Sequence, residues 1–331
     1  MSKLDVVGVG NALVDVLSHE EDDFIARHGL QRGAMQLIDT ARAELLYGAM
    51  GPATEVSGGS AANTMVGVAS LGGAAAFVGR VNDDQLGSVF GHDLRAAGVA
   101  FSTPPATDGV PTGRCLIVVT PDAQRTLNTY LGASARLGPG DLDVDLVASA
   151  QVLYLEGYLW DEPEAKEAFL QAARAAHASG NRVAFSLSDG FCVDRHRDEF
   201  LDLVEHHVDV LFANEVEITS LYRVDEFDDA LQRVQYHCEI AALTRSEKGS
   251  LIVTRDEVHL VDAHPVEQVV DTTGAGDLYA AGFLYGLTHG YDLGTAGRLG
   301  ALAAAEVISH LGARPQVSLA GLSRALLERE A

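Results

Sequence analysis

The sequence predicts an α/β fold, with a doubly wound, mostly parallel sheet and a small inserted β-sheet that forms a lid. Two observations predict it. Short apolar runs bounded by Gly or polar residues alternate with helix-like stretches through most of the chain, which is the pattern of a parallel sheet covered by helices. A β-rich segment at residues 99–132 interrupts that alternation. Because no repeat or long linker divides the 331 residues, one domain spanning residues 1–331 is expected.

The first part of the chain supplies an opening strand and the segments expected to form the lid. Residues 4–9 predict a buried strand, because a Gly-bounded apolar run of this length is typical of a parallel sheet. Two β-rich runs, 114–120 and 125–131, flank the turn 121–124 and predict a hairpin. The lid is expected from residues 12–18, 31–38 and 99–132. The other predicted elements here are helices at 20–28, 40–49 and 83–97, an apolar segment at 61–71 and a strand at 75–78.

Regular alternation of strands and helices is expected after residue 141. The predicted strands are 152–155, 182–187, 208–212, 240–243 and 251–254, and helices are predicted at 163–179 and 194–206. The last two of these strands are expected to form a hairpin across residues 246–249. A strand-like run at 266–270 precedes three predicted helices at 277–290, 293–310 and 319–328.

The composition argues against several classes of partner. The formal net charge is −24, and a surface this acidic repels nucleic acid and anionic membranes. Three widely spaced Cys without a Cys-x-x-Cys predict neither a disulfide framework nor a zinc site and fit a reduced, cytoplasmic compartment. Asp5 interrupts the apolar opening, so no signal peptide is expected, and no apolar run is long enough for a membrane span.

The run Asp-Thr-Thr-Gly-Ala-Gly-Asp at residues 271–277 carries the strongest chemical signal. Gly274 and Gly276 allow positive φ and a close approach of a ligand. Unpaired N–H groups of Ala275, Gly276 and Asp277 at a helix start would form an anion site. This arrangement suits phosphoryl transfer to an alcohol, because the site takes the phosphoryl charge and Asp277 takes the hydroxyl proton. The alternative is a helix cap with a tight turn.

Three motifs in order resemble those of the ribokinase-like (PfkB) carbohydrate and nucleoside kinases. Residues 271–277 resemble the second signature of this family. The first signature is matched at residues 58–64, 71–73 and 79–87, and an Asn-x-x-Glu follows a predicted strand at 214–217. The resemblance runs from residue 5 to about residue 316 and implies an ATP-dependent kinase. No P-loop motif occurs in the sequence, and a dinucleotide-binding oxidoreductase is the main alternative of another class.

The resemblance implies a role for each matching residue. The catalytic base would be Asp277, with an anion hole at Gly274, Ala275 and Gly276. Asn214 and Glu217 would organise Mg²⁺ and the ATP phosphates through water, although a helix N-cap is the simpler local interpretation of this pair. ATP would also contact the loop that contains Thr244 and Gly249, in which Ser246 replaces the usual middle Gly.

The acceptor follows from the spacing of Asn11 and Asp15. These residues lie four apart, as in the adenosine kinase-like branch of the family, so the resemblance implies phosphorylation of adenosine at its 5′-hydroxyl to give AMP and ADP. A carboxylate such as Asp15 can accept hydrogen bonds from two adjacent sugar hydroxyls. A fructokinase, a ribokinase, a keto-deoxy sugar acid kinase and an inosine or guanosine kinase stay open as alternatives.

The residues expected to bind the acceptor come from two regions. The sugar would contact Asn11, Asp15, Gly58, Gly59 and Asn63, with Leu13 facing the base. Apolar lid residues and one aromatic residue would complete the site, although an ordinary buried position is the simpler interpretation of each. These residues are Met35, Leu37, Leu131 and Tyr158.

Three further properties stay open in the sequence. Arg125 and Arg136 are the nearest basic candidates for closing over the phosphates, although a solvated ion pair is the simpler role for each. A monovalent cation such as K⁺ is a possible cofactor, because Asp271 and Thr273 match positions near that site in some relatives; Gln316 departs from their pattern. The exposed edge of the predicted hairpin is compatible with a monomer or a homodimer.

Overall fold

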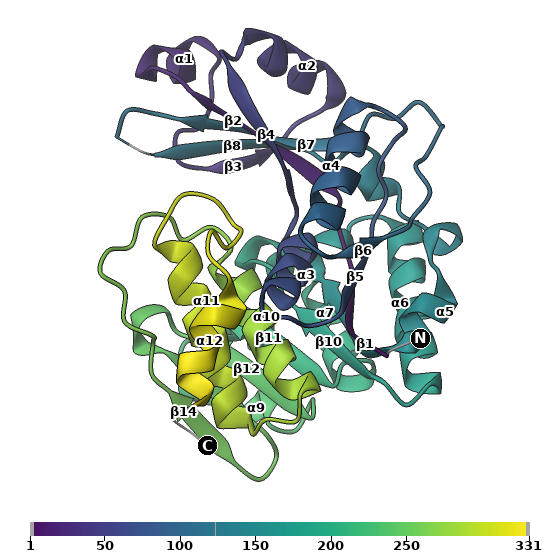
Figure 1. Cartoon of the computed structure of the whole chain (residues 1–331), viewed down its shortest axis with the longest axis vertical. Coiled ribbons are helices and arrows are strands. Elements are labelled where there is room, and N and C mark those ends of the chain that lie inside the picture. The colour runs from purple at the N-terminus through teal and green to yellow at the C-terminus, as the bar shows by residue number, and fades with distance from the viewer. Residues whose placement is uncertain (1–2, 123, 329–331) are drawn as a thin grey trace.

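The structure, a computed structural model, describes residues 3–122 and 124–328. Within these ranges, nine strands form a large sheet in the order β14-β13-β12-β11-β10-β9-β1-β5-β6, and five form a small sheet in the order β3-β8-β7-β2-β4. Figure 1 shows the small sheet standing at one end of the molecule, apart from the large one. Ala123, in the predicted turn 121–124, lies outside the described residues.

The large sheet is parallel from β6 to β12 and antiparallel at β13 and β14. Helices cover both of its faces, so its inner strands, such as β5, β9 and β12, are buried on both sides and are mostly apolar without alternation, whereas the edge strand β14 is largely exposed. The strands are β1 Leu4–Val9, β5 Ala75–Val78, β6 Ala100–Phe101, β9 Ala150–Glu156, β10 Arg182–Ser186, β11 Val210–Asn214, β12 Ile240–Thr244, β13 Ser250–Val253 and β14 Val258–Val261.

Two hydrophobic cores separate the helices into two layers. The first layer is α3 Ser60–Ser70, α4 Gln85–Ala96, α10 Ala275–Thr288, α11 Leu293–Ile308 and α12 Leu319–Leu327. The second is α5 Val144–Ser149, α6 Pro163–Ala178, α7 Gly190–His206, α8 Glu215–Tyr222 and α9 Phe227–Val234. None of the described helices combines the length and the apolar character needed to cross a membrane.

The small sheet has one face packed on helices and one face toward the rest of the molecule. Its strands are β2 Leu13–His19, β3 Met35–Leu37, β4 Ala53–Gly58, β7 Gly113–Val119 and β8 Arg125–Tyr130. Val14 and Leu116 pack with Phe24 of α1 Asp22–Arg27 and with Leu46 of α2 Thr40–Ala49. The alternate residues, among them Cys115 and Ile117, form the opposite face, as strand periodicity requires.

The predicted α/β architecture, the opening strand and both hairpins are confirmed. Three predictions are wrong. β4 was not expected in the small sheet; it lies at the sheet edge, and its first four residues are largely exposed and include Thr54 and Glu55. Residues 99–132 do not all belong to the small sheet, since β6 pairs with β5 of the large one. Residues 266–270 form no strand, because the N–H groups of Val270 and Asp271 bond the carbonyl of Ile308 at the end of α11.

Candidate active site

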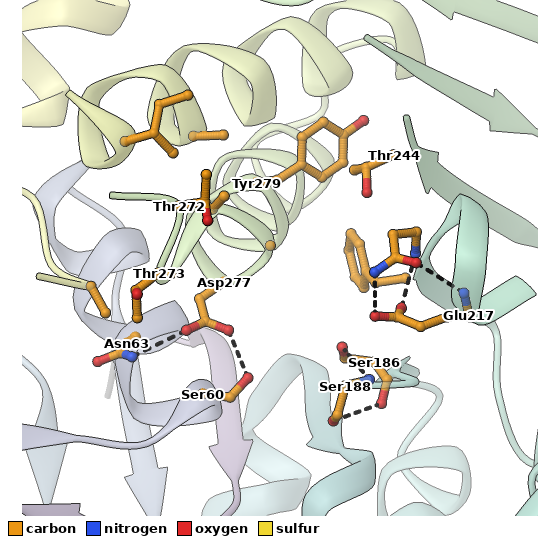
Figure 2. A pocket seen from close by; sticks show the side chains of 18 of the residues that line it. Ser60, Asn63, Ser186, Ser188, Glu217, Thr244, Thr272, Thr273, Asp277 and Tyr279 are labelled. Carbon is orange, nitrogen blue, oxygen red and sulfur yellow. Dashed lines mark hydrogen bonds between the residues drawn. The ribbon is translucent and has the colours of Figure 1, made fainter. Parts of the chain in front are cut away.

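A cavity of about 1320 Å³ lies between the inner face of the small sheet and the large sheet. At one end it is lined by Leu13, Asp15 and Ile117 of the small sheet. At the other end it is lined by Val266, Ala304 and Ile308, beside the loop after β12. Figure 2 shows Asp277 in this cavity, with Thr244 and Glu217 across from it. The cavity therefore has room for two ligands, with a carboxylate between them.

Asp277 lies at the start of α10 and is held by two neutral donors of α3. Its Oδ1 accepts a hydrogen bond from Ser60 Oγ at 2.6 Å, and its Oδ2 accepts one from Asn63 Nδ2 at 3.1 Å (Figure 2). Burial raises the pKa of Asp277, and these two hydrogen bonds and the charge of Arg314 lower it. A carboxylate that is oriented and partly desolvated in this way is suited to accept a proton.

The two glycines before Asp277, Gly274 and Gly276, have different structural roles. Gly274 has φ 81° and is the N-cap of α10; a Cβ at this position would lie 2.8 Å from the backbone of Ala313. A Cβ on Gly276 would meet nothing within 4 Å, so this residue leaves open space in the cavity wall. The predicted anion site differs at Ala275, whose N–H donates to the carbonyl of Thr272 at 3.2 Å. That N–H closes the turn, so the N–H groups of Gly276 and Asp277 are the ones left for an anion.

Asp15 occupies the small-sheet end of the cavity, next to a backbone that only glycine permits. A Cβ on Gly58 would lie 2.6 Å from Asp15 Oδ2, and a Cβ on Gly59 would lie 2.2 Å from the carbonyl oxygen of Asn11. Burial raises the pKa of Asp15 to about 6, while Arg125 and Arg314 lower it. No hydrogen-bond donor among the described residues satisfies this carboxylate, so it has free capacity for a ligand.

Glu156, at the end of β9, is a site residue that the sequence analysis missed. It is fully buried, and its carboxylate accepts hydrogen bonds from Asn11 N at 2.7 Å, Asn11 Nδ2 at 2.9 Å and Ala61 N at 2.6 Å. Glu156 thus joins the end of β1 to the start of α3. Burial raises its pKa to about 7 against these hydrogen bonds. An acidic residue closing an apolar strand was the available signal.

Arg125, at the start of β8, connects the small sheet to the loop before α10. Its side chain is 10% exposed and pairs with Asp271, and Nη1 also donates to Thr273 Oγ1 at 3.1 Å. The solvated ion pair expected for Arg125 is therefore wrong, whereas Arg136 is exposed and pairs loosely with Asp108. Asp271 is a partner that Arg125 reaches only because the small sheet folds over this loop.

Asn214 and Glu217 form a reciprocal capping box at the start of α8. The side chain of Asn214 accepts from the N–H of Glu217, while the Glu217 carboxylate accepts from both the N–H and the side-chain amide of Asn214. Burial raises the pKa of Glu217 to about 7. Both residues line the cavity, so the helix cap and a position beside a ligand are compatible.

The loop after β12 brings Thr244 and Gly249 to the same cavity. Gly249 has φ 83°, and a Cβ there would lie 2.1 Å from the carbonyl oxygen of Val261. Ser246, which stands where the resembling family has Gly, adopts the left-handed φ of 51° that glycine favours. Ser246 thus adopts the backbone conformation that Gly would adopt more easily, and this conformation is strained for a serine.

Most of the residues predicted for the site line this one cavity. Met35 does not; it is 43% exposed on the edge strand β3. Gly58 does not either, because it lies behind the carboxylate of Asp15. The predicted residues that do line it are Asn11, Leu13, Asp15, Leu37, Gly59, Asn63, Leu131, Tyr158, Asn214, Glu217, Thr244, Gly249, Gly274, Ala275, Gly276 and Asp277.

Comparison with known proteins decides the family. Residues 44–319 match the model of the pfkB family of carbohydrate kinases. The chain belongs to this family. It is therefore a kinase that phosphorylates an alcohol group, and its fold brings residues of the segments 58–64, 214–217 and 271–277 together around one cavity.

Solved structures and curated relatives of this kinase differ in their acceptors. It is similar to the adenosine kinase of Sinorhizobium meliloti, with a TM-score of 0.91, 54% identity, and coverage of 98% of this chain and 99% of that one. A probable sugar kinase from Rhizobium etli is similar to the same degree, with a TM-score of 0.91, 52% identity, and coverage of 98% and 99%. The 5-dehydro-2-deoxygluconokinase of Geobacillus thermodenitrificans is 31% identical over 268 residues, which are 77% of this chain and 79% of that protein.

Replacing Glu156 tests its structural role in this kinase. Glu156→Gln is expected to lower the free energy of unfolding by about 1–3 kcal/mol at pH 8, because the new amide faces the N–H of Ala61 donor to donor. The difference in the free energy of unfolding between wild type and Glu156→Gln should increase as the pH falls from 7 to 5. The folded carboxyl, with its pKa of about 7, binds a proton in that range before the unfolded one, whose pKa is near 4.5.

Urea unfolding at several pH values measures both effects. The control is Glu239→Gln, because Glu239 forms an exposed ion pair with Arg182 and should change stability by less than about 0.5 kcal/mol. A gap between wild type and Glu156→Gln that stays constant with pH would show that the pKa of Glu156 is not raised.

Proposed function

We propose that this kinase phosphorylates adenosine at its 5′-hydroxyl, with ATP as the phosphoryl donor and Asp277 as the base. The observation that carries the proposal is the small-sheet end of the cavity. There the carboxylate of Asp15 adjoins an apolar wall that includes Leu13, Ile117 and Leu131. A ribose diol suits the carboxylate, and a purine suits the apolar wall. The similarity to the adenosine kinase of S. meliloti supports the same acceptor.

The reaction follows from the position of Asp277 between the two ends of the cavity. Asp277 accepts the proton of the 5′-hydroxyl as that oxygen attacks the γ-phosphorus of ATP in line. The N–H groups of Gly276 and Asp277, at the start of α10, stabilise the charge on the moving phosphoryl group. We infer that the small sheet acts as a lid over the acceptor, with Arg125 fastening it to Asp271 and excluding water.

The residues present fit Mg²⁺ only as an ion held mainly by phosphates and water. The oxygens of Glu217 and Asn214 are occupied by each other, and the described residues contain no cluster of three His, Cys, Asp or Glu side chains that could hold a metal. Glu217 and Asn214 would therefore bind water molecules of a hydrated ion, as Mg²⁺ prefers. When bound, Mg²⁺ would neutralise charge on the ATP phosphates.

The surroundings of Asp271 do not suit a monovalent cation. Asp271 Oδ1 accepts from both the N–H and the hydroxyl of Thr273, and its Oδ2 accepts from Arg125 and from the N–H of Gly312. Both oxygens are occupied by donors of the chain, and Arg125 supplies the positive charge. We therefore assign K⁺ no part in the proposed reaction.

A second candidate acceptor is 5-dehydro-2-deoxygluconate, because relatives with that activity match most of the chain. Its carboxylate would need a cation at the acceptor end. Arg125 is paired with Asp271, and Arg314 is not among the residues that line the cavity. This favours the nucleoside. A cytoplasmic location and a monomeric or homodimeric state stay predictions.

Initial rates of ADP release test the choice of acceptor. Adenosine, inosine, guanosine, ribose, fructose and 5-dehydro-2-deoxygluconate are compared at equal ATP and Mg²⁺. Adenosine should have a kcat/KM at least about 100-fold above any sugar, because only a nucleoside fills both the polar and the apolar part of the acceptor end. A sugar or sugar acid with the higher kcat/KM would overturn the proposed acceptor and leave the family unaffected.

A further inference from the structure

Arg314 is a half-buried cation that the reaction described above does not use. It follows α11 in the loop that also contains Ala313, against which Gly274 packs. Arg314 Nε donates to Asn63 Oδ1 at 3.2 Å, and Nη1 donates to Ser57 Oγ. Nη2 is buried without a hydrogen-bond partner among the described residues. A guanidinium is costly to bury unless negative charge is near, so its surroundings indicate its purpose.

Three carboxylates lie near Arg314, although none of them forms a salt bridge with it among the described residues. Burial lowers the pKa of Arg314 to about 10, and the charges of Asp15, Asp93 and Asp277 raise it. The guanidinium therefore keeps its charge at neutral pH. Asp15 lies at the acceptor end of the cavity and Asp277 next to it, between the two ends, while Asp93 accepts a hydrogen bond from the N–H of Ser57 at 3.0 Å. Arg314 is thus a positive charge shared by the acceptor end of the site.

The hydrogen bond to Asn63 has a second consequence. A side-chain amide has one accepting end and one donating end of nearly equal shape. Because Arg314 can only donate, it fixes Oδ1 of Asn63 on its own side and turns Nδ2 toward Asp277, where the donor lies 3.1 Å from Oδ2. In the reverse orientation, Oδ1 of Asn63 would face a carboxylate oxygen.

We propose that Arg314 is a positioning residue of the acceptor half of the site, which orients Asn63 toward Asp277 and supplies a positive charge to Asp15 and Asp277. Arg314 is not among the residues that line the cavity, so it acts through these three groups and not by touching the substrates. The inference rests on the proposed function only in that an acceptor hydroxyl gives its proton to Asp277.

The pH dependence of the reaction separates this role from simple packing. Arg314 lowers the pKa of both Asp277 and Asp15, whereas Arg125 lowers that of Asp15. Without Arg314, both carboxylates would hold their protons at higher pH, and a protonated Asp277 cannot act as a base. The titratable groups that face Asp277 are Asp15, Glu156, Tyr154, Tyr158 and Arg314; those that face Asp15 are Cys115, Arg125, Asp277 and Arg314.

The test is the ratio of kcat/KM between variant and wild type from pH 6 to pH 8, with whichever acceptor the wild type uses. The kcat/KM of Arg314→Gln should be about tenfold or more below wild type at pH 8, and the loss should be larger at pH 6, because a base that holds its proton to higher pH is ionised in a smaller fraction there. Arg314→Lys keeps the charge, so its ratio should be lower than one but constant with pH. The ratio cancels the titration of ATP itself.

Two measurements complete the experiment. The dissociation constant of ATP should stay within about twofold in both variants, because Arg314 contacts only the acceptor side. Arg324→Gln removes the same charge from an exposed residue of α12 and should keep wild-type activity. A loss of activity in Arg314→Gln that is uniform across pH would overturn the proposal.

If Arg314→Gln does not fold, the kcat/KM ratio of Arg314→Lys to wild type tests the proposal. A constant ratio clearly below one supports the proposal, and wild-type kcat/KM overturns it because the link to Asn63 would then not matter. The result for Arg314 does not depend on the adenosine proposal. If the wild type prefers another acceptor, the adenosine proposal fails, and the ratios of kcat/KM for the Arg314 variants are measured with that acceptor instead.

Discussion

Asp277→Asn should lower kcat by at least about 100-fold and leave ATP binding nearly unchanged, because the variant lacks a base for the acceptor proton but keeps the shape of the site. Asn can still accept hydrogen bonds from Ser60 or Asn63. Burial of the Asp277 charge is unfavourable in the folded state, so the variant should be at least as stable as wild type. Steady-state kinetics, nucleotide titration and thermal unfolding measure the three quantities.

The control for this variant is Asp292→Asn. Asp292 is the N-cap of α11 and accepts a hydrogen bond from the N–H of Thr295 at 2.9 Å, and Asn is an equally good cap. This control changes the same charge at the start of a neighbouring helix and should keep full activity. Turnover of Asp277→Asn within a few-fold of wild type would remove Asp277 as the base.

Asp15→Ala should lower kcat/KM for adenosine by about 100-fold or more, mainly through KM. Hydrogen bonds to a charged acceptor contribute about 1.5–3 kcal/mol each, and Asp15 can accept one from each hydroxyl of the ribose. The loss should be much smaller with 2′,3′-dideoxyadenosine, which has neither hydroxyl. In wild type, KM for adenosine should rise as the pH falls through about 6, where Asp15 gains a proton.

The matched control is Asp22→Asn. Asp22 lies in α1 beside the same small sheet, and its exposed carboxylate pairs with Arg32. Its removal should change neither KM nor kcat measurably. Equal losses of Asp15→Ala with adenosine and with the dideoxy analogue would contradict the assignment of Asp15 to the diol.

The sequence predicted the elements whose environment is simple. Buried parallel strands such as β1 and β9 are apolar runs of the right length, the long helix α6 has a buried apolar face, and the long helix α11 is rich in apolar residues. The exposed edge strand β4 carries polar residues, so its sequence resembled a loop. Residues 266–270 have strand-like composition, but no strand edge is available there and their backbone pairs with the end of α11.

The site was predictable where function depends on a local motif and not where it depends on tertiary packing. The glycines around Asp277 and the Asn214–Glu217 box are local arrangements within a few residues. Glu156 and Arg314 act on segments 95 and 251 residues away in the sequence, at Ala61 and Asn63. A single sequence contains no information about those distances, and the charge of Arg314 alone resembled that of any surface arginine.

The position of the new phosphate in the product tests the central claim most directly. Adenosine, ATP and Mg²⁺ are incubated with the enzyme, and the product is analysed by ³¹P NMR with proton coupling. If Asp15 holds the diol, the 5′-hydroxyl is the hydroxyl left to face Asp277. The phosphorus should then couple to the two methylene protons on C5′, as in 5′-AMP. Coupling to a single ring proton, as in a 2′- or 3′-phosphate, or no nucleotide product at all, would contradict the account.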